Sequence, residues 1–95
     1  MLDLRNNGLQ GMIPTTFAKF NSLRTLNFNG NQLEGPLPGS LLNCKKLEVL
    51  DVGDNKINGS FPNWLESLPE LQVLILRSNR FECLPEVANH GPVQQ

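Results

Sequence analysis

Residues 47–70 read LEVLDVGDNKINGSFPNWLESLPE, and residues 23–46 read LRTLNFNGNQLEGPLPGSLLNCKK. Placed one above the other, the two stretches agree at their leucine, asparagine, glycine and proline positions. The pattern starts again at Leu71, and an earlier copy is visible from Leu2. Four copies in one register identify a repeat with a period of 24 residues. The chain is therefore expected to form one stack of similar coils.

Each copy opens with leucine-like residues in the spacing L-x-x-L-x-L, which predicts a short strand with one buried face. One strand per copy would stack into a parallel sheet of about four strands. The fold class is thus an α/β repeat, a short solenoid arc with this sheet on its concave side. The inward columns are Leu2, Leu26, Leu50 and Leu74, followed by Leu4, Phe28, Val52 and Leu76.

The rest of each copy has its own regular columns. An asparagine follows each strand, where its amide can bond backbone groups at the bend, so these residues are predicted to be structural. A glycine column suits positive φ, and a following apolar–proline pair indicates a second extended segment. Apolar residues three apart then predict a short helix or 3₁₀ turn on the convex side. The asparagines are Asn7, Asn31, Asn55 and Asn79; the glycines are Gly11, Gly35 and Gly59.

The repeats are expected to occupy residues 1–81, with a partial copy at 1–22, complete copies at 23–46 and 47–70, and an interrupted copy at 71–81. Cys83 replaces the glycine, and Leu84 with Pro85 arrives one residue early. Residues 82–95 show no apolar periodicity and are expected to form a flexible tail without a cap. Uncapped coils expose core, so the chain is expected to self-associate through its two ends, Leu2 with Leu4 and Leu74 with Leu76.

These columns resemble the plant-type leucine-rich repeat, LxxLxLxxNxLxGxIPxxLxxLxx. The resemblance covers residues 1 to about 81, and its LxGxIP half is typical of the extracellular plant class, particularly receptor-like proteins and receptor kinases of the disease-resistance type. It implies an extracellular horseshoe at the plasma membrane that binds peptides, proteins or co-receptors. The chain itself shows no secretory signal and no apolar run long enough to span a bilayer.

Outward positions of the strands are the candidate binding residues, because stacked coils present them as continuous columns on the concave face. Four strands about 4.8 Å apart give a face of ~300 Å², whereas a standard interface uses about 800 Å² per partner. The chain is therefore expected to contribute to recognition rather than to provide a whole interface. The candidates are Asp3, Arg5, Asn27, Asn29, Asp51, Asp54, Ile75 and Arg77.

Other chemistry has weaker support in the sequence. Asn58, Gly59 and Ser60 form an N-glycosylation sequon on a predicted turn. The acidic run around Asp51 and Asp54 fails the calcium-loop spacing, so no metal or cofactor is expected. The single histidine, His90, lies outside the repeats, which argues against catalysis.

The two cysteines and the overall charge place two further limits on the fold and function. Cys44 occupies an apolar column and is expected to be buried rather than bridged to Cys83. A net charge of −1 without a basic block excludes a nucleic-acid partner.

Three hypotheses remain. The first is a non-catalytic recognition segment of a plant receptor-like protein involved in ligand perception or defence signalling. The second is a truncated repeat block without independent activity. The third is a small leucine-rich repeat inhibitor or scaffold protein.

Overall fold

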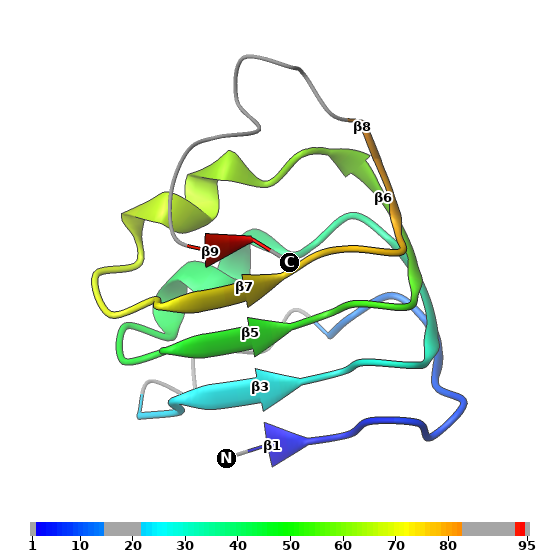
Figure 1. Ribbon diagram of the computed structural model, residues 1–95, viewed down its shortest axis with the longest axis horizontal. Coiled ribbons are helices and arrows are strands. Elements are labelled where there is room, and N and C mark those ends of the chain that lie inside the picture. Colours follow the sequence, from blue (N-terminus) through cyan, green and yellow to red (C-terminus); the bar gives the residue numbers. More distant parts are fainter. Residues whose placement is uncertain (1, 15–21, 83–92, 95) are drawn as a thin grey trace.

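A computed structural model describes residues 2–14, 22–82 and 93–94. Its first sheet contains one strand from each coil, all parallel, and the strands lie side by side in Figure 1. Leu2, Leu26, Leu50 and Leu74 are register partners across this sheet, so the 24-residue period is confirmed as the rise from one coil to the next. The strands, in spatial order, are β1 (Leu2–Asp3), β3 (Thr25–Asn27), β5 (Val49–Asp51), β7 (Val73–Ile75) and β9 (Val93–Gln94).

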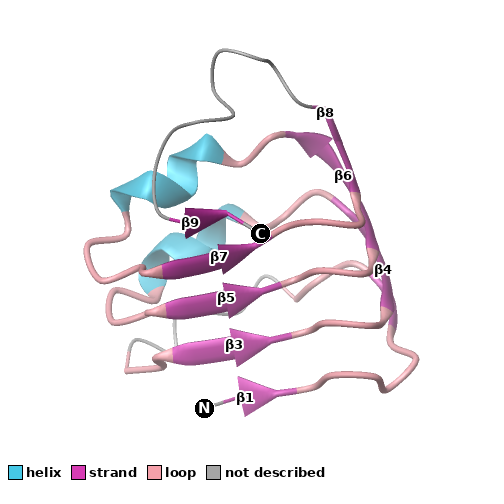
Figure 2. Cartoon of the chain, in the orientation of Figure 1, coloured by secondary structure: helices cyan, strands magenta, loops and turns pink. Residues whose placement is uncertain are grey.

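A second parallel sheet runs along the side of the stack (Figure 2). Sequence analysis placed the second extended segment at the apolar–proline pairs, but the strands lie just before them. The pattern of β4 explains this position, because Leu33 points inward between exposed neighbours, and Pro36 directly after β4 has no N–H for a ladder bond. The strands are β2 (Gln10–Gly11), β4 (Gln32–Gly35), β6 (Lys56–Ser60) and β8 (Arg80–Glu82).

The convex return of two coils is helical, as expected. The 3₁₀ helices η2 (Gly39–Asn43) and η3 (Asn63–Ser67) lie behind the first sheet in Figure 2. Each begins after a proline and buries one leucine, Leu41 in η2 and Leu65 in η3. The residues three positions later, Cys44 and Leu68, are also buried. This spacing is that of a single turn, so the helices need only one apolar contact row.

The two ends of the stack differ. Leu2 and Leu4 are half-buried, as expected for a face without a neighbouring coil. Leu74 and Leu76 are only 2% and 6% exposed, and β9 pairs with β7 beside them. The expectation that this end lies bare is therefore wrong. The expected flexible tail also includes β9 at its end, whereas residues 83–92 lie outside the described residues.

A left-handed backbone position follows every strand of the repeats. Asn6, Gly30, Asp54 and Ser78 occupy the same column, and all have φ between 51° and 74°. The predicted glycine column also adopts positive φ, at 81° for Gly11, 77° for Gly35 and 93° for Gly59. Each of the first three coils thus turns at two fixed left-handed positions. Asp54, a candidate binding residue, is one of these turn residues.

Ser78→Gly is expected to stabilise the chain. Ser78 has φ 61°, and this region costs a residue with a Cβ about 1–2 kcal/mol, which exceeds the 0.5–1 kcal/mol entropic cost of glycine. We expect a gain of about 0.5–1 kcal/mol and a rise in Tm of roughly 4 °C, measured by thermal melting. Ser60→Gly, in the exposed strand position of β6, is the control and should destabilise. Equal effects of the two substitutions would refute the explanation.

Candidate functional site: the polar face of the first sheet

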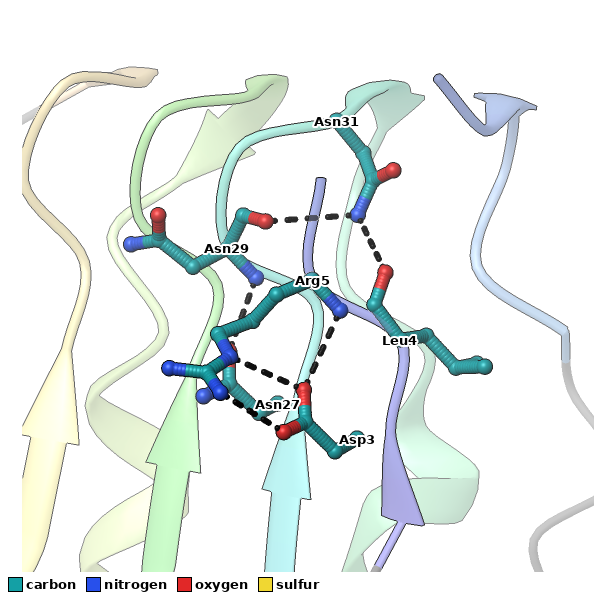
Figure 3. A network of polar contacts seen from close by, with 6 residues as sticks. All are labelled: Asp3, Leu4, Arg5, Asn27, Asn29 and Asn31. Atoms are coloured by element: carbon teal, nitrogen blue, oxygen red, sulfur yellow. Dashed lines mark hydrogen bonds and ion pairs between the residues drawn. The ribbon is translucent and has the colours of Figure 1, made fainter. Parts of the chain in front are cut away.

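The asparagine column forms a hydrogen-bonded ladder beneath the edge of the first sheet. The Asn31 amide nitrogen donates to the carbonyls of Phe28 at 2.7 Å and of Leu4, one coil earlier, at 3.0 Å. Its Oδ1 accepts from the backbone N–H groups of Asn7 and Leu9 at 3.0 Å. Asn31 therefore joins its own strand to the preceding coil, and Figure 3 shows its bond to the Leu4 carbonyl.

Asn55 and Asn79 repeat this geometry one and two coils later. Asn55 donates to the carbonyls of Phe28, Val52 and Gly53 and accepts from the N–H of Leu33. Asn79 donates to the carbonyl of Val52 at 2.8 Å and accepts from the N–H of Ile57 at 3.0 Å. Asn7 is exposed in the first coil, which has no described coil before it.

The central column of the candidate binding face caps the ends of its own strands. Oδ1 of Asp3, Asn27 and Asp51 each accepts the backbone N–H two residues later, at 3.0–3.2 Å. The backbone carbonyl of Phe28 accepts from the Asn55 amide, and that of Val52 accepts from the Asn79 amide. The acidic and amide residues of this face therefore have a local structural partner. Ile75, at the same position in the fourth coil, has no side-chain acceptor to offer.

A hydrogen bond links two coils across the face. Asn29 Nδ2 donates to Asp51 Oδ1 at 3.1 Å, and both side chains are half-buried. Gly53 lies beneath them, because a Cβ there would lie 2.9 Å from Asn29 Nδ2 and 3.2 Å from Ile75 Cγ2. The middle of the face is thus a closed polar surface rather than a set of free side chains.

At the N-terminal end of the face, Asp3 and Arg5 pair with each other. Arg5 Nε donates to Asp3 Oδ1 at 3.0 Å, and Arg5 Nη2 lies 3.0 Å from Asp3 Oδ2 (Figure 3). The pKa of the Asp3 carboxyl is lowered, chiefly by the hydrogen bond from the Arg5 backbone N–H; desolvation opposes this, and the Arg5 side chain adds to it. This ion pair is exposed to solvent, and its two opposite charges neutralise each other.

The Asp3 carboxyl is expected to titrate below its usual range. Because its pKa is lower in the folded chain, its stabilising contribution is present above the unfolded pKa and is lost as pH falls through the folded pKa. An NMR titration of Asp3 measures this directly. Arg5→Ala keeps the backbone N–H of residue 5, so it should raise the pKa of Asp3 only part of the way to its usual value. A normal pKa for Asp3 in the unmodified chain would contradict the backbone cap.

The C-terminal part of the face has a different character. Arg77 is exposed, and Ile75 is half-buried beside Val73 and Val49. Sequence analysis passed over these two valines, although the alternation that turns Asn27 outward also turns them outward. The face therefore changes along the stack from a self-paired ionic end at β1 to an apolar patch with an adjacent arginine at β7.

The remaining candidates lie away from this face. Asn58 and Ser60 of the sequon are exposed on β6 in the second sheet. Cys44 is buried, and desolvation raises the pKa of its thiol. Cys83 and His90 lie outside the described residues.

The described residues hold neither a metal-binding cluster nor a membrane-spanning helix. No three histidine, cysteine or acidic side chains there gather into a group that could hold a metal ion. Among the described residues, no helix combines the length and the apolar character needed to cross a bilayer.

Comparison with known proteins agrees with this architecture. A family model described as "Leucine rich repeat" matches residues 37–81, and a second model described as "Leucine Rich Repeat" matches residues 1–20 and 22–44. No curated protein matches the sequence.

Several solved structures are similar. A chain of the BIR3–SERK2 complex from Arabidopsis thaliana is 38% identical with a TM-score of 0.81, and the match covers 86% of this chain and 44% of that one. The ectodomain of the receptor kinase SOBIR1 from the same plant is 36% identical with a TM-score of 0.79, over 84% and 44% of the two chains.

A third match is the plant peptide hormone receptor RGFR1 in complex with RGF2. It is 30% identical with a TM-score of 0.81, over 86% of this chain and 13% of the receptor. The chain therefore spans less than half the length of these structures. It belongs to the leucine-rich repeat family and has the coil architecture of plant receptor-kinase ectodomains.

Proposed function

We propose that the chain is a non-catalytic recognition segment, which contributes the outward face of β3, β5 and β7 to the binding of a peptide, protein ligand or co-receptor in a plant receptor ectodomain. The observation that carries the proposal is the composition of the C-terminal part of this face. Val49, Val73 and Ile75 are half-exposed apolar side chains, and the exposed Arg77 lies beside them. Defence signalling and a place on the extracellular side of the plasma membrane belong to the same proposal.

In this proposal the sequence-predicted binding residues have different tasks. Asp3, Asn27 and Asp51 cap backbone N–H groups, and Arg5 pairs with Asp3, so these residues would have to give up bonds to hold a ligand. Within the described residues, the side chains of Ile75 and Arg77 make no such bond. A ligand would therefore gain most from an apolar group over Ile75 and an acceptor for the guanidinium of Arg77.

Peptide selection with matched variants tests the proposal. Random 12-residue peptides displayed on phage are selected on the purified 95-residue chain, and enriched peptides are measured by fluorescence anisotropy. We expect Arg77→Glu and Ile75→Asp to weaken binding at least tenfold, while Glu66→Arg, on the exposed side of η3, leaves it unchanged. The SERK2 ectodomain serves as a co-receptor probe with the same variants.

Two outcomes would count against the proposal. Binding that is lost in Glu66→Arg but kept in Arg77→Glu would move recognition to the convex side. Failure to enrich any peptide, together with no binding of the SERK2 ectodomain, would favour a repeat block without independent activity.

N-glycosylation at Asn58 belongs to the same proposal. The Asn58 side chain is exposed on β6, in the second sheet and away from the face of β3, β5 and β7, so a glycan there leaves that face accessible. When the chain is secreted from plant cells behind an added signal peptide, we expect a mass increase that glycosidase treatment removes. Asn58→Gln and Ser60→Ala should abolish it, and Ser60→Thr should retain it. An unmodified secreted chain would exclude the site.

A further inference from the structure

The chain contains three Asn–Gly steps, and they lie in different surroundings. An asparagine that precedes glycine can react with its own main chain, because a neighbour without a Cβ lets the next backbone nitrogen approach the side-chain carbonyl carbon. The rate depends on whether that nitrogen and the side-chain amide are held by other groups. The steps are Asn7–Gly8 in the turn after β1, Asn29–Gly30 in the turn after β3, and Asn58–Gly59 within β6.

The Asn7–Gly8 step is the free one of the three. Both residues are exposed, and they lie outside the strands in the blue part of the chain in Figure 1. Within the described residues, the Asn7 side chain makes no hydrogen bond and the Gly8 N–H donates none. A Cβ built on Gly8 would have nothing within 4 Å. Among the described residues, no hydrogen bond of the reacting groups therefore has to break before the Gly8 nitrogen reaches Asn7 Cγ.

The other two steps are held in place. The Gly30 N–H donates to the Gly53 carbonyl at 3.1 Å, and Asn29 Nδ2 donates to Asp51 Oδ1 at 3.1 Å. The Asn58–Gly59 step lies inside β6, where that strand pairs in register with β8. Reaction at either step requires hydrogen bonds or strand pairing to open first, which lowers its rate.

We propose that Asn7 is a site of spontaneous deamidation, with water as the only co-reactant. The Gly8 nitrogen loses its proton and attacks Asn7 Cγ; the new C–N bond closes a succinimide ring, and the bond between Cγ and Nδ2 breaks to release ammonia. Water then opens the ring at either of its carbonyl carbons. One opening gives aspartate, and the other gives isoaspartate, in which the main chain runs through Cβ and Cγ. The site is separate from the outward face of β3, β5 and β7.

The isoaspartate product disturbs the asparagine ladder. Asn31 Oδ1 accepts the backbone N–H groups of Asn7 and Leu9, both at 3.0 Å. Isoaspartate adds one methylene group to the main chain between these two donors, so they no longer both reach one oxygen with good geometry. Aspartate leaves the main chain unchanged. Only the isoaspartate product is therefore expected to release this turn from the second coil.

Mass spectrometry of the incubated chain tests the proposal. The full 95-residue chain, produced in bacteria, is kept at mildly alkaline pH in water labelled with ¹⁸O. Peptide mapping locates the incorporated label, and a protein isoaspartate methyltransferase reports the isoaspartate fraction. We expect label at Asn7 to appear at least about tenfold faster than at Asn29 or Asn58, because those steps must first lose hydrogen bonds. Asn7→Gln should abolish the fast reaction, since glutamine would form a larger ring that closes more slowly.

The unfolded chain is the matched control. In guanidinium chloride, Asn7, Asn29 and Asn58 all precede glycine in an open chain, so they should react at similar rates. The isoaspartate form, separated by chromatography, should lose protection from amide exchange at Leu9 by NMR, whereas Asn7→Asp should keep it. The proposal is overturned if Asn7 reacts no faster than Asn29 in the folded chain, if the difference between them persists in guanidinium chloride, or if Leu9 exchange is the same in the isoaspartate form and the unmodified chain.

Discussion

Asn55→Leu is expected to lower the free energy of unfolding by about 3 kcal/mol, the cost of leaving buried polar groups without partners. The Leu33 N–H loses its acceptor, and the carbonyls of Phe28 and Val52 each lose one of two amide donors. Leucine has a similar volume, so packing alone does not explain the loss. A domain of this size has a total stability of roughly 5–15 kcal/mol, so the variant should be close to unfolding.

The repeat supplies its own control for this prediction. Asn7 occupies the same column but is exposed, and its side chain makes no hydrogen bond within the described residues. Asn7→Leu should therefore change stability by less than about 0.5 kcal/mol. Urea denaturation followed by circular dichroism compares the two variants. Equal losses at both positions would mean that the column acts through local turn propensity rather than through bonds between coils.

Local patterns were sufficient to predict much of the fold. Alternation places Leu26 of β3 and Phe28 just after it inward, and Gly35 belongs to a column with glycine in three copies, which indicates a left-handed turn. The 3₁₀ helices follow from Leu41 and Cys44 at a spacing of three. These features depend on neighbours within a few residues, and repetition strengthens each of them.

Features that depend on which backbone N–H and C=O groups of neighbouring coils find partners were not predictable in this way. Asp51 reads as a free acidic residue, yet it accepts the Gly53 N–H and the Asn29 amide. The Phe28 carbonyl of the preceding coil accepts from the amides of Asn31 and Asn55, and the Gly53 N–H donates to the Asp51 side chain. β9 escaped prediction because it has neither the leucine pattern nor the 24-residue spacing. Both cases require the three-dimensional register of the coils.

Leu50→Ala is expected to cost about 3–4 kcal/mol, within the range measured for buried leucines that leave a cavity. Leu50 is fully buried and pairs in register with Leu26 on one side and Leu74 on the other. Alanine removes the contact between coils on both sides at once, and the stacked strands cannot close the gap without breaking their ladder bonds. Leu2→Ala, at the half-buried end of the same column, should cost less than about 1.5 kcal/mol.

The position of Leu50 also predicts a change in cooperativity. In a solenoid each coil contacts only its neighbours, so the free energy that couples coils 23–46 and 71–82 passes through the coil of Leu50. Leu50→Ala should therefore broaden the urea transition and lower its m-value, because part of the chain unfolds before the rest. Leu2→Ala weakens only a terminal contact and should keep the m-value unchanged. If Leu50→Ala shifts the midpoint without altering the m-value, the coils are coupled strongly enough to unfold as one unit, and coupling must then run through the asparagine ladder rather than the leucine column.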